Sequence, residues 1–339
     1  MPGENPVVRP FPPFEPTPWL PGPHAQTLFG ALARRRRLPF SREALVTPDG
    51  DELILDHLEG PAESPRLLVL HGLEGSSFSS SVGSLLRAAA GLGMKATALN
   101  FRSCARDPRD RRKWIPNRRP RLYHSGETTD LGFVVTTLSL REPSAPLLLA
   151  GVSLGGNVVM KWLGESRGQS RVRAAAVISV PFDLAAGARH LETRLGSVYV
   201  RSFVRTLAAK AERITRLFPQ AASRIDLPRA RRAETFFEFD DAATAPLHGF
   251  AGAEDYWARS SSLAFLDAID TPALCIGAED DPFLPAEALH RAARAASGSV
   301  TVVAERRGGH CGFWTGATPF SLRSHSAETA VSWLAERAA

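Results

Sequence analysis

The sequence predicts an α/β fold, in which helices cover both faces of a mostly parallel sheet. Between residues 66 and 180, short apolar segments of strand length alternate with segments that have a helical pattern. The apolar segments are nearly continuous, which is typical of parallel strands that are buried on both faces. The alternation stops after residue 181 and resumes near residue 271. These observations indicate one α/β core that is interrupted by an insertion.

An antiparallel hairpin is expected to precede the alternating part. It runs from Glu43 to Glu59 around the turn Pro48-Asp49-Gly50-Asp51, because Asp-Gly between two apolar segments favours a tight turn. Strands and helices then alternate, as crossover connections between parallel strands require. The expected strands are 67–71, 95–100, 147–152 and 174–180, and the expected helices are 82–91, 126–140 and 157–164.

The insertion is expected to be a helical cap. Residues 182–266 contain no clear strand, residues 191–218 are strongly amphipathic, and residues 236–239 read Phe-Phe-Glu-Phe. Such a cap forms an apolar pocket, but its aromatic residues serve equally well to pack it on the core, and both interpretations stay open. The predicted divisions are an N-terminal extension packed on the core (1–40), the first part of the core (41–181), the helical cap (182–266) and the second part of the core (267–339).

The segment Gly151-Val152-Ser153-Leu154-Gly155 places a serine between a predicted strand and a predicted helix. In this context a G-x-S-x-G sequence forms a sharp turn that raises the serine hydroxyl above the edge of the sheet. Only small residues fit two positions before and after that serine, and Gly151 and Gly155 meet this requirement. Ser153 is therefore the candidate nucleophile. A serine needs a histidine base, and the histidine needs a carboxylate partner.

Candidates for the acid and the base follow later strands, in the chain order Ser, acid, His that this turn implies. His310 comes after the expected strand at 299–303 and is flanked by glycines, which leave its loop free to aim the ring. Asp280 and Asp281 follow the expected strand at 271–277. Adjacent side chains point in different directions, and we favour Asp281 because it would begin the turn Asp-Pro-x-x-Pro. Asp280 would then cap a turn.

Two backbone N–H groups are the candidate oxyanion donors. A tetrahedral intermediate of acyl transfer needs preorganised donors for its negative oxygen. One is the N–H of Leu154, directly after the candidate nucleophile, and the other is the N–H of Leu73 in the loop after the strand at 66–70. Gly72 lets that loop approach a substrate closely, and His71 is placed to support it by a hydrogen bond.

Composition and cysteine usage indicate a globular protein of a reducing compartment. Apolar residues make up 44% of the 339 residues and charged residues 22%, as in ordinary globular chains. The three cysteines, Cys104, Cys275 and Cys311, form no disulfide framework and no metal-ligand spacing. We therefore expect a cytoplasmic protein without a metal or a cofactor.

The formal charge of +6 comes largely from Arg34 to Arg37 and from the segment 106–121. No nucleic-acid-binding motif accompanies these residues, so no nucleic-acid partner is expected. A solvated loop is the favoured interpretation, and peripheral contact with an anionic membrane is the alternative. No stretch reaches the roughly 18 apolar residues of a membrane span.

Further motifs occupy residues 18–28, 71–77, 99–104, 122–131, 151–157, 244–250, 280–283 and 308–313. Together they resemble those of the α/β-hydrolase superfamily, and more narrowly of the YheT-like hydrolases. The resemblance implies a serine carboxylesterase or a lipase-like enzyme, with acyltransferases among the relatives. It also places a catalytic triad on Ser153, Asp281 and His310. The motifs extend over nearly the whole chain.

The function predicted from these patterns is hydrolysis of a small-molecule carboxylic ester with a short to medium acyl chain, or of a lipid ester, through an acyl-enzyme intermediate. An acyltransferase that passes the acyl group to an alcohol or thiol would use the same residues and is the first alternative. A non-catalytic binding protein of the same fold is a remote one, because all the candidate residues are present.

Overall fold

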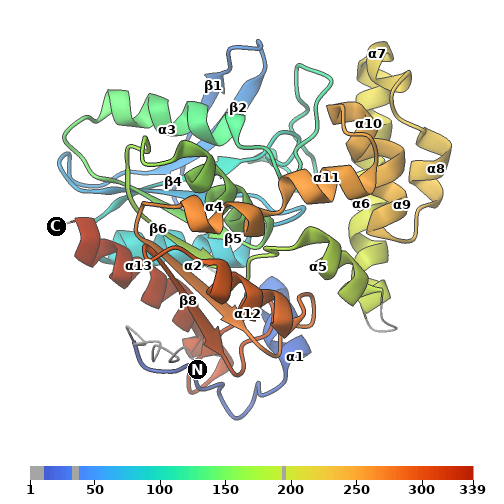
Figure 1. The fold of residues 1–339 in the computed structure, drawn as a ribbon. Coiled ribbons are helices and arrows are strands. Elements are labelled where there is room, and N and C mark those ends of the chain that lie inside the picture. The colour runs from blue at the N-terminus through green and yellow to red at the C-terminus, as the bar shows by residue number, and fades with distance from the viewer. Residues whose placement is uncertain (1–10, 33–37, 193–195, 339) are drawn as a thin grey trace.

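An eight-stranded sheet forms the centre of the molecule (Figure 1). The computed structural model describes residues 11–32, 38–192 and 196–338. The strand order is β1-β2-β4-β3-β5-β6-β7-β8, in which β1–β2 and β2–β4 pair antiparallel and the other pairs are parallel. The predicted α/β class and its leading hairpin are thus confirmed. The strands are β1 (Ser41–Val46), β2 (Glu52–Leu58), β3 (Arg66–Leu70), β4 (Lys95–Asn100), β5 (Leu147–Val152), β6 (Val172–Ile178), β7 (Ala273–Ala278) and β8 (Val300–Glu305).

Helices cover both faces of this sheet, and their apolar residues form two separate clusters. One cluster includes residues of α3, α4 and α12, and the other includes residues of α2 and α13. No helix in the described ranges is both long and apolar enough to cross a bilayer. The helices outside the insertion are α1 (Pro23–Leu32), α2 (Ser80–Gly91), α3 (Thr129–Arg141), α4 (Leu154–Ser166), α12 (Ala286–Ala295) and α13 (His325–Ala338). Short elements near the C-terminus are β9 (Trp314–Thr315), the 3-10 helix η3 (Pro319–Ser321) and β10 (Arg323–Ser324).

The central strands show how the two clusters arise. Every residue of β3 is buried. Leu68 and Leu70 belong to the cluster on the α4 face, whereas Leu67 and Val69 belong to the cluster on the α13 face. Because successive side chains of a strand point to opposite faces, a continuous apolar strand supplies both layers of core.

Between β6 and β7 the chain forms a series of helices, which we call the inserted helices. Figure 1 shows α6 to α10 gathered at one end of the molecule. In α6, Val200, Val204, Leu207, Ala211 and Ile214 are buried, at the three- and four-residue spacing of an amphipathic helix. The inserted helices are α5 (Leu184–Leu191), α6 (Gly196–Leu217), α7 (Pro219–Ala222), α8 (Leu227–Arg232), α9 (Phe236–Phe239), the π-helical turn η1 (Asp240–Thr244), α10 (Ala245–His248), α11 (Ala253–Ser260) and the 3-10 helix η2 (Ser262–Ala268).

Several expected helix boundaries differ from the structure. The amphipathic segment 191–218 is not one helix, because α5 ends at Leu191 and α6 begins at Gly196. Helix α3 begins at Thr129 rather than at Gly126. Helix α4 begins at Leu154, three residues before the expected start, because the chain turns directly from the strand into the helix at the preceding serine.

Candidate active site

Ser153 occupies a tight turn between β5 and α4. Its backbone has φ 52° and ψ −120°, a conformation that residues other than glycine rarely adopt. The glycines on either side are required by space. A Cβ on Gly151 would lie 2.6 Å from the carbonyl oxygen of Gly155, and a Cβ on Gly155 would lie 2.5 Å from the carbonyl oxygen of His71. The turn therefore presents the Ser153 hydroxyl at the end of the sheet, as the motif predicted.

The structure brings Ser153, His310 and Asp281 together. His310 Nε2 lies 2.9 Å from Ser153 Oγ, and His310 Nδ1 lies 2.8 Å from Asp281 Oδ2. Burial favours the neutral ring, but the charge of Asp281 outweighs it and holds the pKa of His310 well above its usual value. The arrangement can move a proton from the serine to the ring and stabilise the charge that results.

The two adjacent aspartates have different partners. Asp281 Oδ1 accepts a hydrogen bond from the N–H of Phe283 (2.8 Å), which fixes the carboxylate as the start of a turn and leaves Oδ2 for His310. Asp280 Oδ1 instead accepts from the N–H of Gly309 (2.9 Å) and so supports the histidine loop. Asp281 is thus the hydrogen-bond partner of the ring, and its role as the catalytic acid stays a prediction.

Helix α1 supports the loop that carries His310. Thr27 Oγ1 accepts a hydrogen bond from the backbone N–H of His310 (2.9 Å), and the buried Gln26 bonds both the N–H and the carbonyl of Trp314. Gly309 has φ +61°, and a Cβ there would lie 2.4 Å from the carbonyl oxygen of Pro23. Position 309 therefore requires glycine because the loop lies close against α1, and not only because glycine makes the loop flexible.

The loop after β3 is held by His71. Its Nε2 accepts from the N–H of Phe101 (3.1 Å), so Nδ1 carries the proton and donates to the carbonyl of Gly72 (2.7 Å). Burial lowers the pKa of His71 to about 3 and keeps the ring neutral. Because N–H and C=O point in opposite directions across a trans peptide, this bond turns the N–H of Leu73 away from His71. A Cβ on Gly72 would lie 3.2 Å from Ser153 Cβ, so this loop lies directly against the serine.

The second candidate donor is the N–H of Leu154. Leu154 is the first residue of α4. The N–H groups in the first turn of a helix have no acceptor within the helix, and the helix dipole favours negative charge at this end. An oxygen bound to the carbon that Ser153 attacks can accept from this group.

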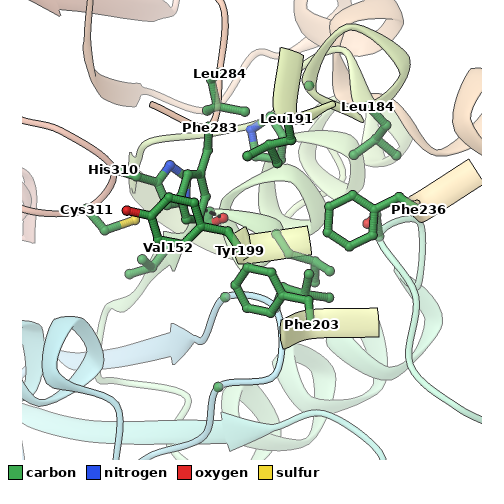
Figure 2. A pocket seen from close by; sticks show the side chains of 18 of the residues that line it. Val152, Leu184, Leu191, Tyr199, Phe203, Phe236, Phe283, Leu284, His310 and Cys311 are labelled. Atoms are coloured by element: carbon green, nitrogen blue, oxygen red, sulfur yellow. Dashed lines mark hydrogen bonds between the residues drawn. The ribbon is translucent and has the colours of Figure 1, made fainter. Parts of the chain in front are cut away.

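A cavity of about 540 Å³ opens at Ser153. Figure 2 shows His310 and Cys311 on one side of it and Leu184 and Phe236 on the opposite side. The ring of Phe283 stacks on the His310 ring at a centroid distance of 4.4 Å. The cavity is thus walled by both the core and the inserted helices, and most of its wall is apolar. Further lining residues from the inserted helices are Leu191, Tyr199, Phe203, Leu207 and Trp257.

The basic segment 106–121 is only partly solvated. Arg121 pairs with Asp49 and with Glu127, and Arg118 lies 2.6 Å from Glu52. The other basic cluster, Arg34 to Arg37, lies outside the described residues. Within the described residues there is no group of three or more His, Cys, Asp or Glu side chains arranged to hold a metal.

Comparisons with known proteins identify the family of this chain. The family profile described as the alpha/beta hydrolase fold matches residues 65–317. The chain is 35% identical to the "Putative esterase YheT" of Escherichia coli over 86% of this chain and 84% of that protein. The chain belongs to the α/β-hydrolase family. It is also 28% identical to "Phospholipase ABHD3" of Mus musculus over 90% of this chain and 74% of that protein.

Solved structures support the same fold for this α/β-hydrolase. The structure of the esterase PF2001 of Pyrococcus furiosus superposes with a TM-score of 0.53 at 14% identity, over 88% of this chain and 89% of that one. Sequence reasoning on this α/β-hydrolase missed the roles of Gln26 and Thr27. The motif around them was visible, but nothing local connects it with a histidine loop nearly 300 residues later.

Proposed function

We propose that this α/β-hydrolase cleaves carboxylic esters with an apolar acyl chain, through an acyl-enzyme formed on Ser153. The observation that carries the proposal is the continuous hydrogen-bonded series from Ser153 through His310 to Asp281, at 2.9 and 2.8 Å, at the wall of an apolar cavity. The protein is a carboxylic ester hydrolase, because its relatives include an esterase and a phospholipase. The acyl-enzyme on Ser153 and the apolar acyl chain are our proposal.

In the proposed reaction His310 takes the proton of Ser153 as the serine oxygen attacks the ester carbonyl. The N–H groups of Leu73 and Leu154 stabilise the negative oxygen of the tetrahedral intermediate. His310 then gives its proton to the leaving alcohol, and the acyl group stays on Ser153. Asp281 keeps the Nδ1–H tautomer and stabilises the charged ring. Water repeats the steps and releases the acid.

Labelling with a fluorophosphonate probe tests the nucleophile, because an activated serine attacks phosphorus as it attacks a carbonyl. The expected adduct lies on the peptide that contains Ser153, and Ser153→Ala should abolish it. Ser179→Ala is the matched control and should keep the labelling. Ser179 also has a positive φ and follows a neighbouring strand. Labelling of another serine, or none in the folded protein, would overturn the assignment.

We also propose a cytoplasmic protein that meets its ester substrates at or near an anionic membrane. All three cysteines are free, which supports a reducing compartment. The net charge of +6 supports attraction to anionic lipid. Sedimentation with vesicles of phosphatidylserine and phosphatidylcholine tests this, and equal binding to vesicles without phosphatidylserine would contradict it.

A further inference from the structure

The cavity wall includes a carboxylate, that of Asp240, among aromatic residues. Asp240 begins the π-helical turn η1 and lines the cavity together with Phe236, Tyr256 and Trp257. It lies deep among other residues, yet part of its surface stays accessible. Asp240 therefore stands at the wall of the space in which a substrate would lie. Single π-helical turns frequently occur at functional sites.

The carboxylate of Asp240 is held in place but is not neutralised. Thr244 Oγ1 donates to its Oδ1 (2.7 Å), and Trp257 Nε1 donates to its Oδ2 (2.8 Å). Within the described parts of the chain, no cationic side chain lies within ion-pair distance of it. An ionised carboxylate has about four acceptor positions, and these two bonds leave some of them unused.

The neighbouring Asp241, in contrast, is a carboxylate with a structural role. Asp241 pairs with Arg229 at 3.0 Å and accepts from the N–H of Ala253 (3.3 Å), so it joins two of the inserted helices. Among the residues that the structure describes, Asp240 has no such cation, although an unpaired buried charge is costly. Burial raises the pKa of Asp240 to about 6, which still leaves it mostly ionised at neutral pH.

A series of aromatic rings connects the triad with the segment that carries Asp240. Aromatic rings lead from His310 through Phe283 and Phe203 to Phe236, with successive centroid distances of 4.4, 6.2 and 6.2 Å. Asp240 lies one helical turn beyond Phe236. A group bound at Asp240 is therefore connected to the ester by an apolar part of the substrate, which contacts these rings.

We propose that Asp240 anchors a polar subsite that binds a hydrogen-bond donor of the substrate, a hydroxyl or an ammonium group, at a distance from the ester. Both donors offer the same chemistry, an N–H or O–H directed at a carboxylate oxygen. The proposal rests on the proposed function and defines the substrate class further: an ester with an apolar middle and a polar end. An ester that ends in a methyl group would leave the carboxylate without a partner.

The first test compares three esters that differ only at one end, which is a hydroxyl, an ammonium or a methyl group. Each of the three esters is made with several chain lengths, so that the distance between the ester and this end varies. At the matching length, the wild type should favour a donor-bearing ester over its methyl analogue by roughly tenfold to a hundredfold in kcat/KM, as expected for a charge-assisted hydrogen bond. Asp240→Asn should reduce this ratio toward one. A ratio between two substrates is independent of the fraction of active protein.

The control variant is Asp241→Asn, which removes the adjacent carboxylate and should leave the ratio unchanged. The two donor-bearing esters identify the donor in the wild type, because the ester with the larger ratio to its methyl analogue carries the group that the subsite binds. A ratio that Asp240→Asn leaves intact would overturn the proposal. So would a wild type that prefers the methyl ester at every length.

Binding to the Ser153→Ala protein separates this proposal from the proposed function. Calorimetric titration with the same esters requires no hydrolysis. Tighter binding of a donor-bearing ester than of its methyl analogue supports the subsite even if the wild type cleaves none of them. Equal binding at every length overturns it even if the wild type is an active esterase.

Discussion

Lys210 of α6 and Glu74 of the loop after β3 form a buried ion pair, with Lys210 Nζ 2.5 Å from Glu74 Oε1. Both side chains are more than nine-tenths buried. Tyr123 donates to the same oxygen (2.8 Å), and its own hydroxyl oxygen accepts from the N–H of Glu74 (2.8 Å). Glu74 directly follows Leu73, so an inserted helix is joined by charge to the loop of a candidate oxyanion donor.

Lys210→Met should lower the free energy of unfolding by about 3 to 5 kcal/mol, because it leaves the Glu74 charge buried without its partner. Chemical denaturation measures this. Adding Glu74→Gln should recover part of the loss, since the unpaired charge is then removed. Arg201→Met is the control, because Arg201 pairs with Glu234 at the surface and should change stability by less than about 1 kcal/mol. Equal effects of Lys210→Met and Arg201→Met would contradict the prediction.

Asp281→Asn should lower kcat by roughly 10³ to 10⁴, because the ring would lose the partner that sets its tautomer. Asp280→Asn is the matched control and should cost far less, since Asp280 bonds the backbone of Gly309. A reversed order would make Asp280 the acid.

The pH profile of the same Asp281→Asn variant gives a second measurement. Only a neutral His310 accepts the serine proton, so kcat/KM falls as the pH decreases through its pKa. The Asp281 charge raises that pKa. The acid limb of Asp281→Asn should therefore lie at lower pH than that of the wild type. A limb at unchanged pH would show that Asp281 does not set the charge of the ring.

Thr27→Val should lower kcat about fivefold on a short acetyl ester and leave KM nearly unchanged. The substitution removes the acceptor of the His310 N–H, a hydrogen bond worth about 1 kcal/mol. Thr27→Ser keeps the hydroxyl and should keep the activity. If valine keeps the activity and serine loses it, the methyl group and not the hydrogen bond supports the loop.

Asp240→Asn should change how stability depends on pH. Burial raises the pKa of Asp240 from 3.8 to about 6, so the folded protein binds this proton more tightly than the unfolded chain. The wild type therefore loses stability relative to Asp240→Asn as the pH rises from about 4 to above 6. The rise in pKa of about two units corresponds to a loss of about 3 kcal/mol in the free energy of unfolding. Denaturation of both proteins at pH 4 and pH 8 measures the difference, which should be absent if the carboxylate is partnered.

The acyl chain should be limited by the size of the cavity. Each CH₂ that the cavity buries contributes about 0.8 kcal/mol, or up to roughly fourfold in kcat/KM. Activity should rise from acetyl toward medium-chain esters and then level or fall. A flat or steadily falling profile, measured below the solubility limit of each ester, would mean that the inserted helices only pack on the core.

The sequence by itself determined the fold class and the serine turn, because both depend on local patterns. Continuous apolar strands specify a buried parallel sheet, and the glycines around Ser153 specify a turn whose spacing is fixed within five residues. The sequence also predicted the strands that Asp281 and His310 follow, which are β7 and β8. Their roles in the reaction stay predictions, as does the division into core and cap.

Only the tertiary structure decided which distant residues meet at the site. Thr27 and His310 are 283 residues apart, and Glu74 and Lys210 are 136 residues apart. Sequence periodicity carries no information about such pairs, because they depend on how the sheet and the inserted helices pack. Asp240 belongs to the same class: in the sequence it is one of two adjacent aspartates, and only the tertiary structure places it at the cavity wall and brings Trp257 and Thr244 to its carboxylate.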